Sequence, residues 1–337
     1  MLMRRGVNPT TAAVCCAAAA AAGPSAAAAE PFVVATVQRP TPVAAGGGLA
    51  VWSAYDPSGG RYALKAWDDR AQAVKPVVVR ERAVPFDAAV ADDGKTIFFS
   101  RCAREHAGVT GTPRWRLERG CVLRRADAQT GAERQVGVSH PPGAVDVLPA
   151  ARGTHLAFVR WRAGTKVASI MLTTTRGGTP RTLVRIPLLT LQDGPTGLAL
   201  TGTGIVYTEQ RTLKGVTGFT RLVTASWGGR RRILDQIRSG GMILRALTPP
   251  SVVGTTTVSY ARNEYSTGLA GTFATISITA PAGTRPTTTP APAWATSTAV
   301  LRDRMIYVTE RLPLVQACAE PPDTTGCQIV LDDHAGG

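Results

Sequence analysis

The chain has 337 residues, of which 44% are hydrophobic, and it carries a formal net charge of +15. A charge of this size bears on solubility and on non-specific partners but does not determine the fold. After residue 29, no run reaches the roughly 18 uncharged apolar residues that a membrane-spanning helix needs, so the sequence excludes such a helix there. The spacing of Cys and His also fits no zinc motif, and we expect neither a metal nor another cofactor.

The N-terminus has the layout of a secretory signal. Two arginines near the start precede an apolar run of small residues, Thr11–Ala22. Cleavage after Ala29 satisfies the small-x-small rule of signal peptidase sites. We therefore predict a signal peptide over residues 1–29, a mature domain over residues 30–337, and a secreted or cell-envelope location.

The mature part reads as a succession of short strands. Runs rich in β-branched and aromatic residues alternate with clusters of Gly, Pro, Asp and Ser, and no helical periodicity interrupts them. Six runs fit one template: two apolar or small residues, an aromatic residue, and a small or β-branched residue. In chain order they are Ala50–Ser53, Ile97–Ser100, Leu156–Val159, Ile205–Thr208, Val258–Ala261 and Met305–Val308.

The aromatic residues of these runs recur at intervals between 47 residues, from Trp52 to Phe99, and 59 residues, from Phe99 to Phe158. Such intervals are typical of four-stranded propeller blades. A second alternating strand follows each aromatic strand, and another short strand precedes it, as at Pro85–Val90. The sequence therefore predicts an all-β fold, a six-bladed β-propeller, with strands named A to D from the centre outward.

The two ends of the mature part predict how the ring closes. The last blade ends after its C strand, near Leu331, and lacks a D strand, whereas Phe32–Val37 is a strand without a blade. Pairing the two would remove an exposed strand edge. We expect the N-terminal strand to complete the last blade.

One repeat carries a resemblance to a known family. Ala91–Phe99, with the residues ADDGKTIFF, is followed by Asp127–Arg134, with the residues DAQTGAER. Together they resemble the TolB-type, WD40-like propeller repeat, which reads S-P-D-G-K, then an apolar-aromatic strand, then D-x-x-T-G. Asp92 stands where that family has Pro, and the other blades keep the strand but lose the turn acid. The resemblance implies an architecture more than an activity.

Four cysteines follow the predicted signal peptide, and their even number in an exported chain indicates disulfides. Pairing Cys102 with Cys121 and Cys318 with Cys327 is the simplest of three connectivities. Both pairs would lie between the B and C strands of their blades, in the second and sixth blades. We expect them to stabilise long loops.

A basic sector on blades two and three is the candidate binding site. The segments 101–121 and 160–166 each have a net charge of +3, whereas 310–327 is net −2. Arginine beside tryptophan suits anionic sugars, nucleotides or acidic protein surfaces. The alternative is that the tryptophans cover the disulfide loop and the arginines are only solvated. The sector comprises Arg101, Arg104, Arg114, Trp115, Arg116, Arg160, Trp161 and Arg162.

Two carboxylates are weak catalytic candidates. Asp87 and Asp146 both lie twelve residues before their blade aromatic, which places them at matching positions near the channel. Neighbouring carboxylates can divide acid and base roles. The alternative is that they mark polar strand starts that cap backbone groups.

These observations favour a secreted, monomeric, non-enzymatic binding or scaffold propeller. Its partner would be an unknown protein or an anionic polymer at the cell envelope, such as a glycan. No RNP-like aromatic ladder accompanies the charge, so specific nucleic-acid binding is not expected. The competing hypothesis is a propeller hydrolase, similar to a glycosidase or lactonase, that uses Asp87 and Asp146 at the channel mouth.

Overall fold

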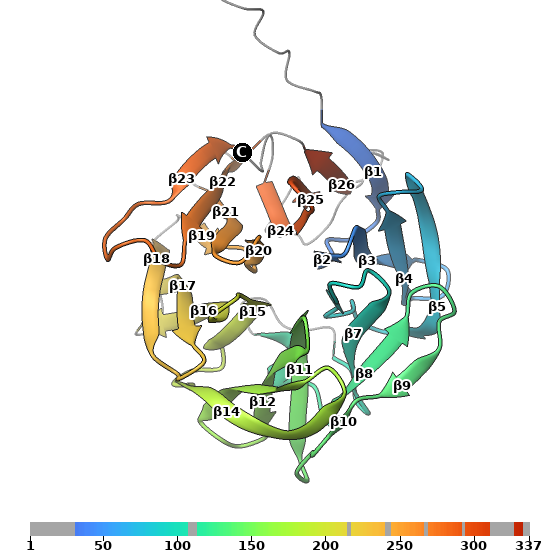
Figure 1. Ribbon diagram of the computed structural model, residues 1–337, viewed down its shortest axis with the longest axis horizontal. Helices are drawn as coiled ribbons and strands as arrows, with labels where there is room; N and C mark the ends of the chain where they lie inside the picture. Colours follow the sequence, from blue (N-terminus) through green and yellow to red (C-terminus); the bar gives the residue numbers. More distant parts are fainter. Residues whose placement is uncertain are drawn as a thin grey trace, which may run out of the picture.

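The computed structural model describes residues 31–106, 113–213, 217–239, 244–265, 269–291, 294–310 and 327–332. In this part of the chain, six β-sheets form a ring around a central axis, as Figure 1 shows. The six-bladed β-propeller predicted from the sequence is confirmed. The predicted signal peptide lies outside the described residues. None of the helices found in the described ranges has the length and apolar character that a membrane crossing requires.

Each blade is a small, mainly antiparallel sheet. Blade one contains β2 (Val43–Gly46), β3 (Leu49–Asp56), β4 (Arg61–Asp68) and β5 (Ala73–Arg82), and blade two contains β6 (Ala89–Val90), β7 (Thr96–Arg101), β8 (Val122–Asp127) and β9 (Glu133–Gln135). Blade three contains β11 (Ala144–Arg152), β12 (His155–Arg162), β13 (Val167–Thr174) and β14 (Gly177–Pro187), with β10 (Gly137–Val138) parallel to β14, and blade four contains β15 (Gly194–Leu200), β16 (Gly204–Leu213), β17 (Thr217–Ser226) and β18 (Arg231–Ser239). Blade five contains β19 (Leu244–Leu247) and β20 (Ser251–Val253), both paired with β21 (Thr257–Tyr265), then β22 (Leu269–Ser277) and β23 (Thr287–Pro290), and blade six contains β24 (Trp294–Leu301), β25 (Arg304–Glu310), β26 (Cys327–Asp332) and β1 (Phe32–Val37).

The repeated aromatic residues form the core. All six lie on the second strand of their blades, and each is at most 1% exposed. The hydrophobic clusters occupy the spaces between neighbouring blades; Trp52 of blade one, for example, packs in one cluster with Ile306 of blade six. Because a blade is apolar on both faces, it is stable only between two neighbours. The 47- to 59-residue spacing is therefore the spacing of core positions.

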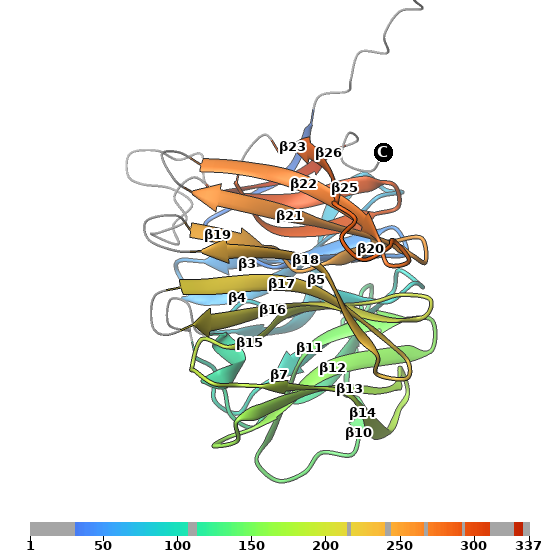
Figure 2. The same cartoon turned by 90° about the vertical axis from the view of Figure 1, so that its left-hand side faces the viewer.

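The strand directions assign the connections to the two faces of the ring. In the side view of Figure 2, the strands run from one face to the other. Antiparallel pairing then brings the B–C loops and the connections between blades to the same face. The loop between β7 and β8 and the connection between β14 and β15 share this face, and they carry most of the polar contacts described below.

The ring closes as predicted. β1 pairs with β26, with Phe32 opposite Leu331 and Val37 opposite Cys327. Figure 1 shows β1, in blue, beside β26, in dark red. The sixth blade thus combines strands from both ends of the described chain, with β1 as its outer strand.

The inner strand of blade two is shorter than the predicted strand Pro85–Val90, because ladder pairing begins only at Ala89. The side chain of Asp87 replaces the missing strand partner. Its Oδ1 accepts the backbone N–H of Ser100 at 2.9 Å, so the strand start is closed by a side chain instead of a ladder bond.

Candidate functional site

The disulfide between Cys102 and Cys121 is confirmed, and it closes the loop between β7 and β8. Backbone hydrogen bonds between Arg104 and Arg119 extend the closure past the sulfurs. The loop contains the 3-10 helix η1 (Arg114–Arg116). Cys327 also takes part in a disulfide; Cys318 lies outside the described residues, so that pairing stays a prediction.

The two tryptophans of the predicted binding sector lie inside the protein. Trp115, on η1, and Trp161, on β12, are 4% and 5% exposed, and their rings meet edge to face with centroids 5.9 Å apart. Trp115 Nε1 also donates to the Pro195 carbonyl at 3.0 Å. Trp115 therefore ties the blade-two loop to blades three and four.

Two arginines of the sector, Arg101 and Arg160, form ion pairs within the ring. Arg101 Nε donates to Glu133 at 2.6 Å. Arg160 binds Asp146 through two nitrogens, each at 2.7 Å. His140 Nδ1 lies 2.9 Å from the same carboxylate. Both oxygens of Asp146 are therefore engaged by cationic or polar neighbours.

Two further arginines of the sector, Arg114 and Arg116, extend from η1 toward backbone carbonyls. Arg114 Nη1 donates to the Pro85 carbonyl at 2.7 Å. Arg116 Nη1 donates to the carbonyls of Thr190 and Asp193 in the connection between blades three and four. These guanidinium groups tie loops to one another. The members of the sector that are exposed to solvent are Arg104 and Arg162.

Asp87 connects blades two and three. Its Oδ1 accepts from the N–H and the hydroxyl of Ser100, and its Oδ2 accepts the N–H of Leu148 at 2.8 Å. Leu148 has φ = 50° at an irregularity of the β11–β12 pairing. Thr248 of blade five makes the equivalent bond to the N–H of Ala261, so a side-chain oxygen at the inner strand start recurs.

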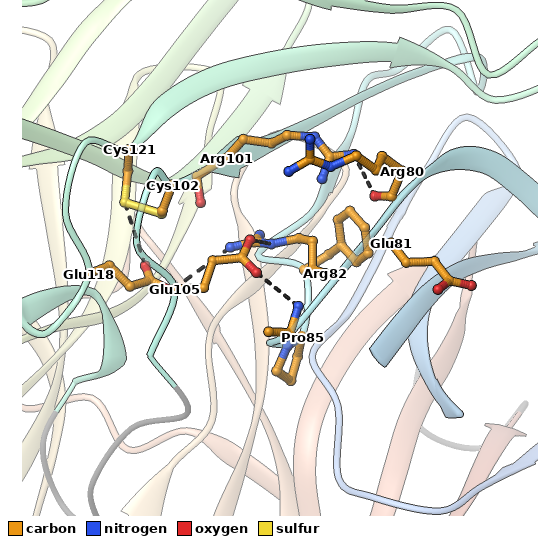
Figure 3. Close-up of polar contacts among 12 residues, drawn as sticks. Arg80, Glu81, Arg82, Pro85, Arg101, Cys102, Glu105, Glu118 and Cys121 are labelled. Carbon is orange, nitrogen blue, oxygen red and sulfur yellow. Dashed lines mark hydrogen bonds and ion pairs between the residues drawn. A yellow bond between two sulfur atoms is a disulfide. The ribbon is translucent and has the colours of Figure 1, made fainter. Parts of the chain in front are cut away.

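A buried ion cluster lies beside the Cys102–Cys121 disulfide, and Figure 3 shows its members Arg82, Glu105 and Glu118. Arg82 has a fully buried side chain and binds Glu105 through Nε at 2.8 Å. It also lies 3.4 Å from Asp87 and 3.8 Å from Glu118. Arg114 Nε lies 2.9 Å from Glu118 Oε1. The buried ion cluster thus consists of Arg82, Asp87, Glu105, Arg114 and Glu118.

Glu118 lies between Arg82 and Arg114 in this cluster and is itself fully buried. Burial raises the pKa of its carboxyl, with Asp87 and Glu105 adding to the rise and the two arginines opposing it. Glu118 Oε2 also lies 3.9 Å from Cys121 Sγ. Cys102, Cys121 and Glu118 are close enough to hold a metal ion, but both sulfurs are bonded to each other and so are not available as thiolate ligands.

A cavity of about 420 Å³ lies on the axis of the ring. The inner strands of all six blades line it, mostly with small apolar residues. Asp87, Arg114 and Glu118 line it at the disulfide-loop end. Two further charged residues line it, Asp92 in the turn between β6 and β7 and Arg152 at the end of β11. Asp146, the other carboxylate of the predicted pair, is not among the lining residues.

The connection between β14 and β15 presents two leucines to solvent. We call residues Leu188–Asp193 the leucine loop: Leu189 is 77% exposed and Leu191 66%, whereas Asp193 is fully buried. Asp193 Oδ2 accepts the N–H groups of Leu189 and Thr190, at 2.8 and 3.1 Å. Its Oδ1 accepts the N–H of Thr212 from blade four, at 2.8 Å. A buried carboxylate thus fixes a loop in which Leu189 and Leu191 are exposed.

Exposed cations lie around the leucine loop. Arg119 stacks on Trp161, with its Cζ 5.5 Å from the ring centroid. The Lys166 carbonyl accepts the N–H of Leu188 at 2.7 Å. Within the described residues, the cations of this cationic rim pair with no carboxylate, and segments 101–106, 113–121, 160–167 and 187–194 contain no exposed one. The cationic rim comprises Arg104, Arg119, Arg162 and Lys166.

Some of these residues were not found from the sequence. Glu118 and Arg82 appear there as isolated charges, and only the fold brings them together. Asp193 reads as an ordinary turn residue before Gly194. A usable signal did exist in the run Leu188–Leu191, because two leucines flank a polar residue in a segment between strands, where apolar side chains are uncommon.

No family model matches the chain, and no curated protein matches it. Among solved structures, it is similar to a Dyadobacter fermentans protein of unknown function, with 8% identity, a TM-score of 0.56, and coverage of 90% of this chain and 98% of that one. TolB from Acinetobacter baumannii gives 14% identity and a TM-score of 0.48, over 75% of this chain and 55% of that one. An oligogalacturonate lyase in complex with manganese gives 13% and 0.47, over 91% and 82%. The likeness to the Dyadobacter fermentans protein concerns the fold alone, which in this chain is a six-bladed β-propeller.

Proposed function

We propose that this chain is an extracytoplasmic binding propeller that docks a protein partner on its disulfide-loop face. The docking face consists of the leucine loop and the cationic rim. Its partner would present apolar side chains within an acidic surface. The observation that carries the proposal is the leucine loop, where Asp193 holds Leu189 and Leu191 outward in a fixed conformation.

The energetics of this loop support a binding role. Exposing two leucines forgoes about 1.5–3 kcal/mol of burial for each of them, and a disordered connection would not need a buried carboxylate to shape it. Arg116 adds a second constraint from blade two. A preorganised loop loses less entropy when it binds, so more of the contact energy appears as affinity.

The charges around the loop support an acidic partner. Four exposed cations without exposed carboxylates attract a negative surface and accelerate its approach. The extracytoplasmic location is supported by the Cys102–Cys121 disulfide, since such bonds persist in oxidising compartments, and by the layout of residues 1–29.

The competing hydrolase hypothesis receives less support from the contacts. Asp146 is bound bidentately by Arg160, and Asp87 is bound by backbone N–H groups of two blades. Both carboxylates have clear structural partners. Asp146 forms its ion pair with Arg160 within blade three, and of the two carboxylates Asp87 alone lines the axial cavity.

The test compares three immobilised proteins: the wild-type chain, the double variant Leu189→Asp/Leu191→Asp, and the control Val78→Asp. Val78 is 70% exposed on the outer strand β5, outside the docking face. From envelope and culture-fluid fractions, we expect one protein to be retained by wild type and control and lost by the double variant, and its retention to fall with added salt. Equal retention on all three surfaces, or none on any, would refute the proposal.

A further inference from the structure

The axial cavity has the walls of a small-molecule site. Five blades contribute an alanine to its lining, and its volume of about 420 Å³ lies within the roughly 300–1,000 Å³ of typical ligand pockets. Small side chains leave this space open where larger ones would fill it. The alanines are Ala44, Ala45, Ala88, Ala89, Ala150, Ala151, Ala199 and Ala299.

The inner strands also offer hydrogen-bonding groups. Each of them is the last strand of its sheet on the axial side and pairs only with the second strand of its blade. The free edge of such a strand carries backbone N–H and C=O groups without a ladder partner. A ligand on the axis would therefore meet apolar side chains interspersed with backbone donors and acceptors.

One end of the cavity is charged. Asp87, Arg114 and Glu118 line it there, and they belong to the buried ion cluster. When all its members are ionised, that cluster contains three carboxylates and two guanidinium groups. The ionised cluster then has a net charge of −1 at the wall of the cavity, although each of its carboxylates contacts an arginine.

Unsatisfied polar atoms mark the same place. Glu118 Oε1, Arg114 Nε and Arg82 Nη2 all lack a hydrogen bond within the described residues, although Oε1 lies 2.9 Å from Arg114 Nε and 3.8 Å from Arg82 Nη2. A buried acceptor without a donor costs about 1–3 kcal/mol. Burial raises the pKa of Glu118, which agrees with a buried carboxyl group whose charge the two arginines compensate only in part. A positively charged donor in the cavity would donate a hydrogen bond to Glu118 Oε1 and would neutralise the net negative charge of the cluster.

We propose that the axial cavity is a binding site for an ammonium group on an aliphatic body, with Glu118 as the acceptor of the ammonium. The aliphatic body lies among the alanines of the inner strands. This site is distinct from the docking face, so it does not depend on the proposed partner. The ammonium group has two sources, a free alkylamine or a lysine side chain of a peptide.

The first test needs no variant. The wild-type chain is titrated calorimetrically with hexylammonium, 1-hexanol and hexanoate, which share one chain length and differ in the charge of the head. We expect hexylammonium to bind at least about 30-fold more tightly than the other two, because truncating one partner of a buried charge pair costs about 2 kcal/mol or more. Equal binding of hexanoate, or no binding of hexylammonium, would overturn the proposal.

Two variants and one additional probe locate the site. Glu118→Gln should remove the preference for hexylammonium while leaving the weaker binding of 1-hexanol unchanged. Ala199→Leu should weaken both by filling the cavity, whereas the docking-face variant Leu189→Asp should change neither. Hexylammonium affinity that is unaffected by both cavity variants would refute the assignment. Nα-acetyl-lysine methylamide, titrated beside hexylammonium, distinguishes a peptide lysine from a free amine by which of them binds more tightly.

Discussion

Asp87 Oδ2 accepts the backbone N–H of Leu148 at 2.8 Å across the boundary between blades two and three. Leu148 has a positive φ, a conformation that few residues other than glycine adopt. The carboxylate therefore holds a strained strand of the neighbouring blade while it also closes the strand start of its own blade. It fixes the relative position of two blades.

Replacing Asp87 should destabilise the ring. Asp87→Ala leaves the N–H groups of Ser100 and Leu148 and the buried Arg82 without their acceptor. We expect the free energy of unfolding in urea to fall by about 3 kcal/mol. Asp87→Asn, which retains one acceptor oxygen, should lose about half as much. The control is Asp303→Asn, an exposed residue in the β24–β25 turn; if it costs as much as Asp87→Ala, this assignment is wrong.

The pair Asp146 and Arg160 should show measurable coupling. Its two short hydrogen bonds are largely buried, but the Arg160 side chain is 14% exposed. We expect a coupling energy of about 1–2 kcal/mol, which is larger than for surface pairs. A double-mutant cycle with Asp146→Asn and Arg160→Met, followed by denaturant unfolding, measures it. A coupling near zero would mean that the pair contributes nothing to stability.

The disulfide should stabilise the loop and the blades it joins. Removing it with Cys102→Ser/Cys121→Ser should lower the unfolding free energy by about 3 kcal/mol, as expected for a loop of this length. The contacts of Trp115 and Arg116 depend on the same loop, so proteolysis within residues 101–121 should also become faster. Limited trypsin digestion of both proteins tests this; equal cleavage rates would contradict it.

Alkaline pH should destabilise the protein through Tyr207. Burial, with the charge of Glu209, raises the pKa of Tyr207 to about 12. Above pH 10 the unfolded chain loses this proton while the folded chain retains it, so the unfolding free energy falls as pH rises from 10 to 12. Denaturant unfolding at pH 8, 10 and 11.5 measures the decline. Tyr207→Phe should make it shallower, and an unchanged slope would exclude Tyr207 as the cause.

The closing strand offers a matched pair of substitutions. Val37 is 3% exposed and packs in the cluster that contains Trp52 and Ile306, whereas Val33 on the same strand is 43% exposed. Val37→Asp should cost about 3 kcal/mol or more, because it buries a charge without a partner. Val33→Asp should stay within about 0.5–1 kcal/mol of wild type. Thermal unfolding of both compares the inner and outer faces of β1.

The sequence predicts the ring because the ring is periodic. Trp52, Phe99 and their counterparts occupy the same core position in each blade, so their spacing carries the blade length. The pairing of the closing strand follows from a similar argument. The chain has one strand without a blade at its N-terminal end, and its last blade lacks an outer strand, so pairing the two completes the ring. Local alternation and repeat length are sufficient for these features.

The candidate functional site is harder to predict from the sequence than the ring, because its contacts join residues far apart in the chain. Trp115 bonds to Pro195, and Arg116 to Asp193. A count of charge on a loop does not reveal whether an arginine faces solvent or a backbone carbonyl. In the sequence, most of the basic sector therefore resembles a binding surface, whereas the exposure of Leu189 and Leu191 depends on the contacts of Asp193 in the fold.

The pairing of β1 with β26 also bears on how the molecule is made. Synthesis delivers Phe32–Val37 first, but their partners, Cys327–Asp332, arrive only after all five intervening blades. Until then the nascent ring keeps two unpaired strand edges, the features that favour aggregation. Closing so large a loop is entropically costly and slow. The topology thus makes the pairing of β1 with β26 the last blade contact that synthesis allows.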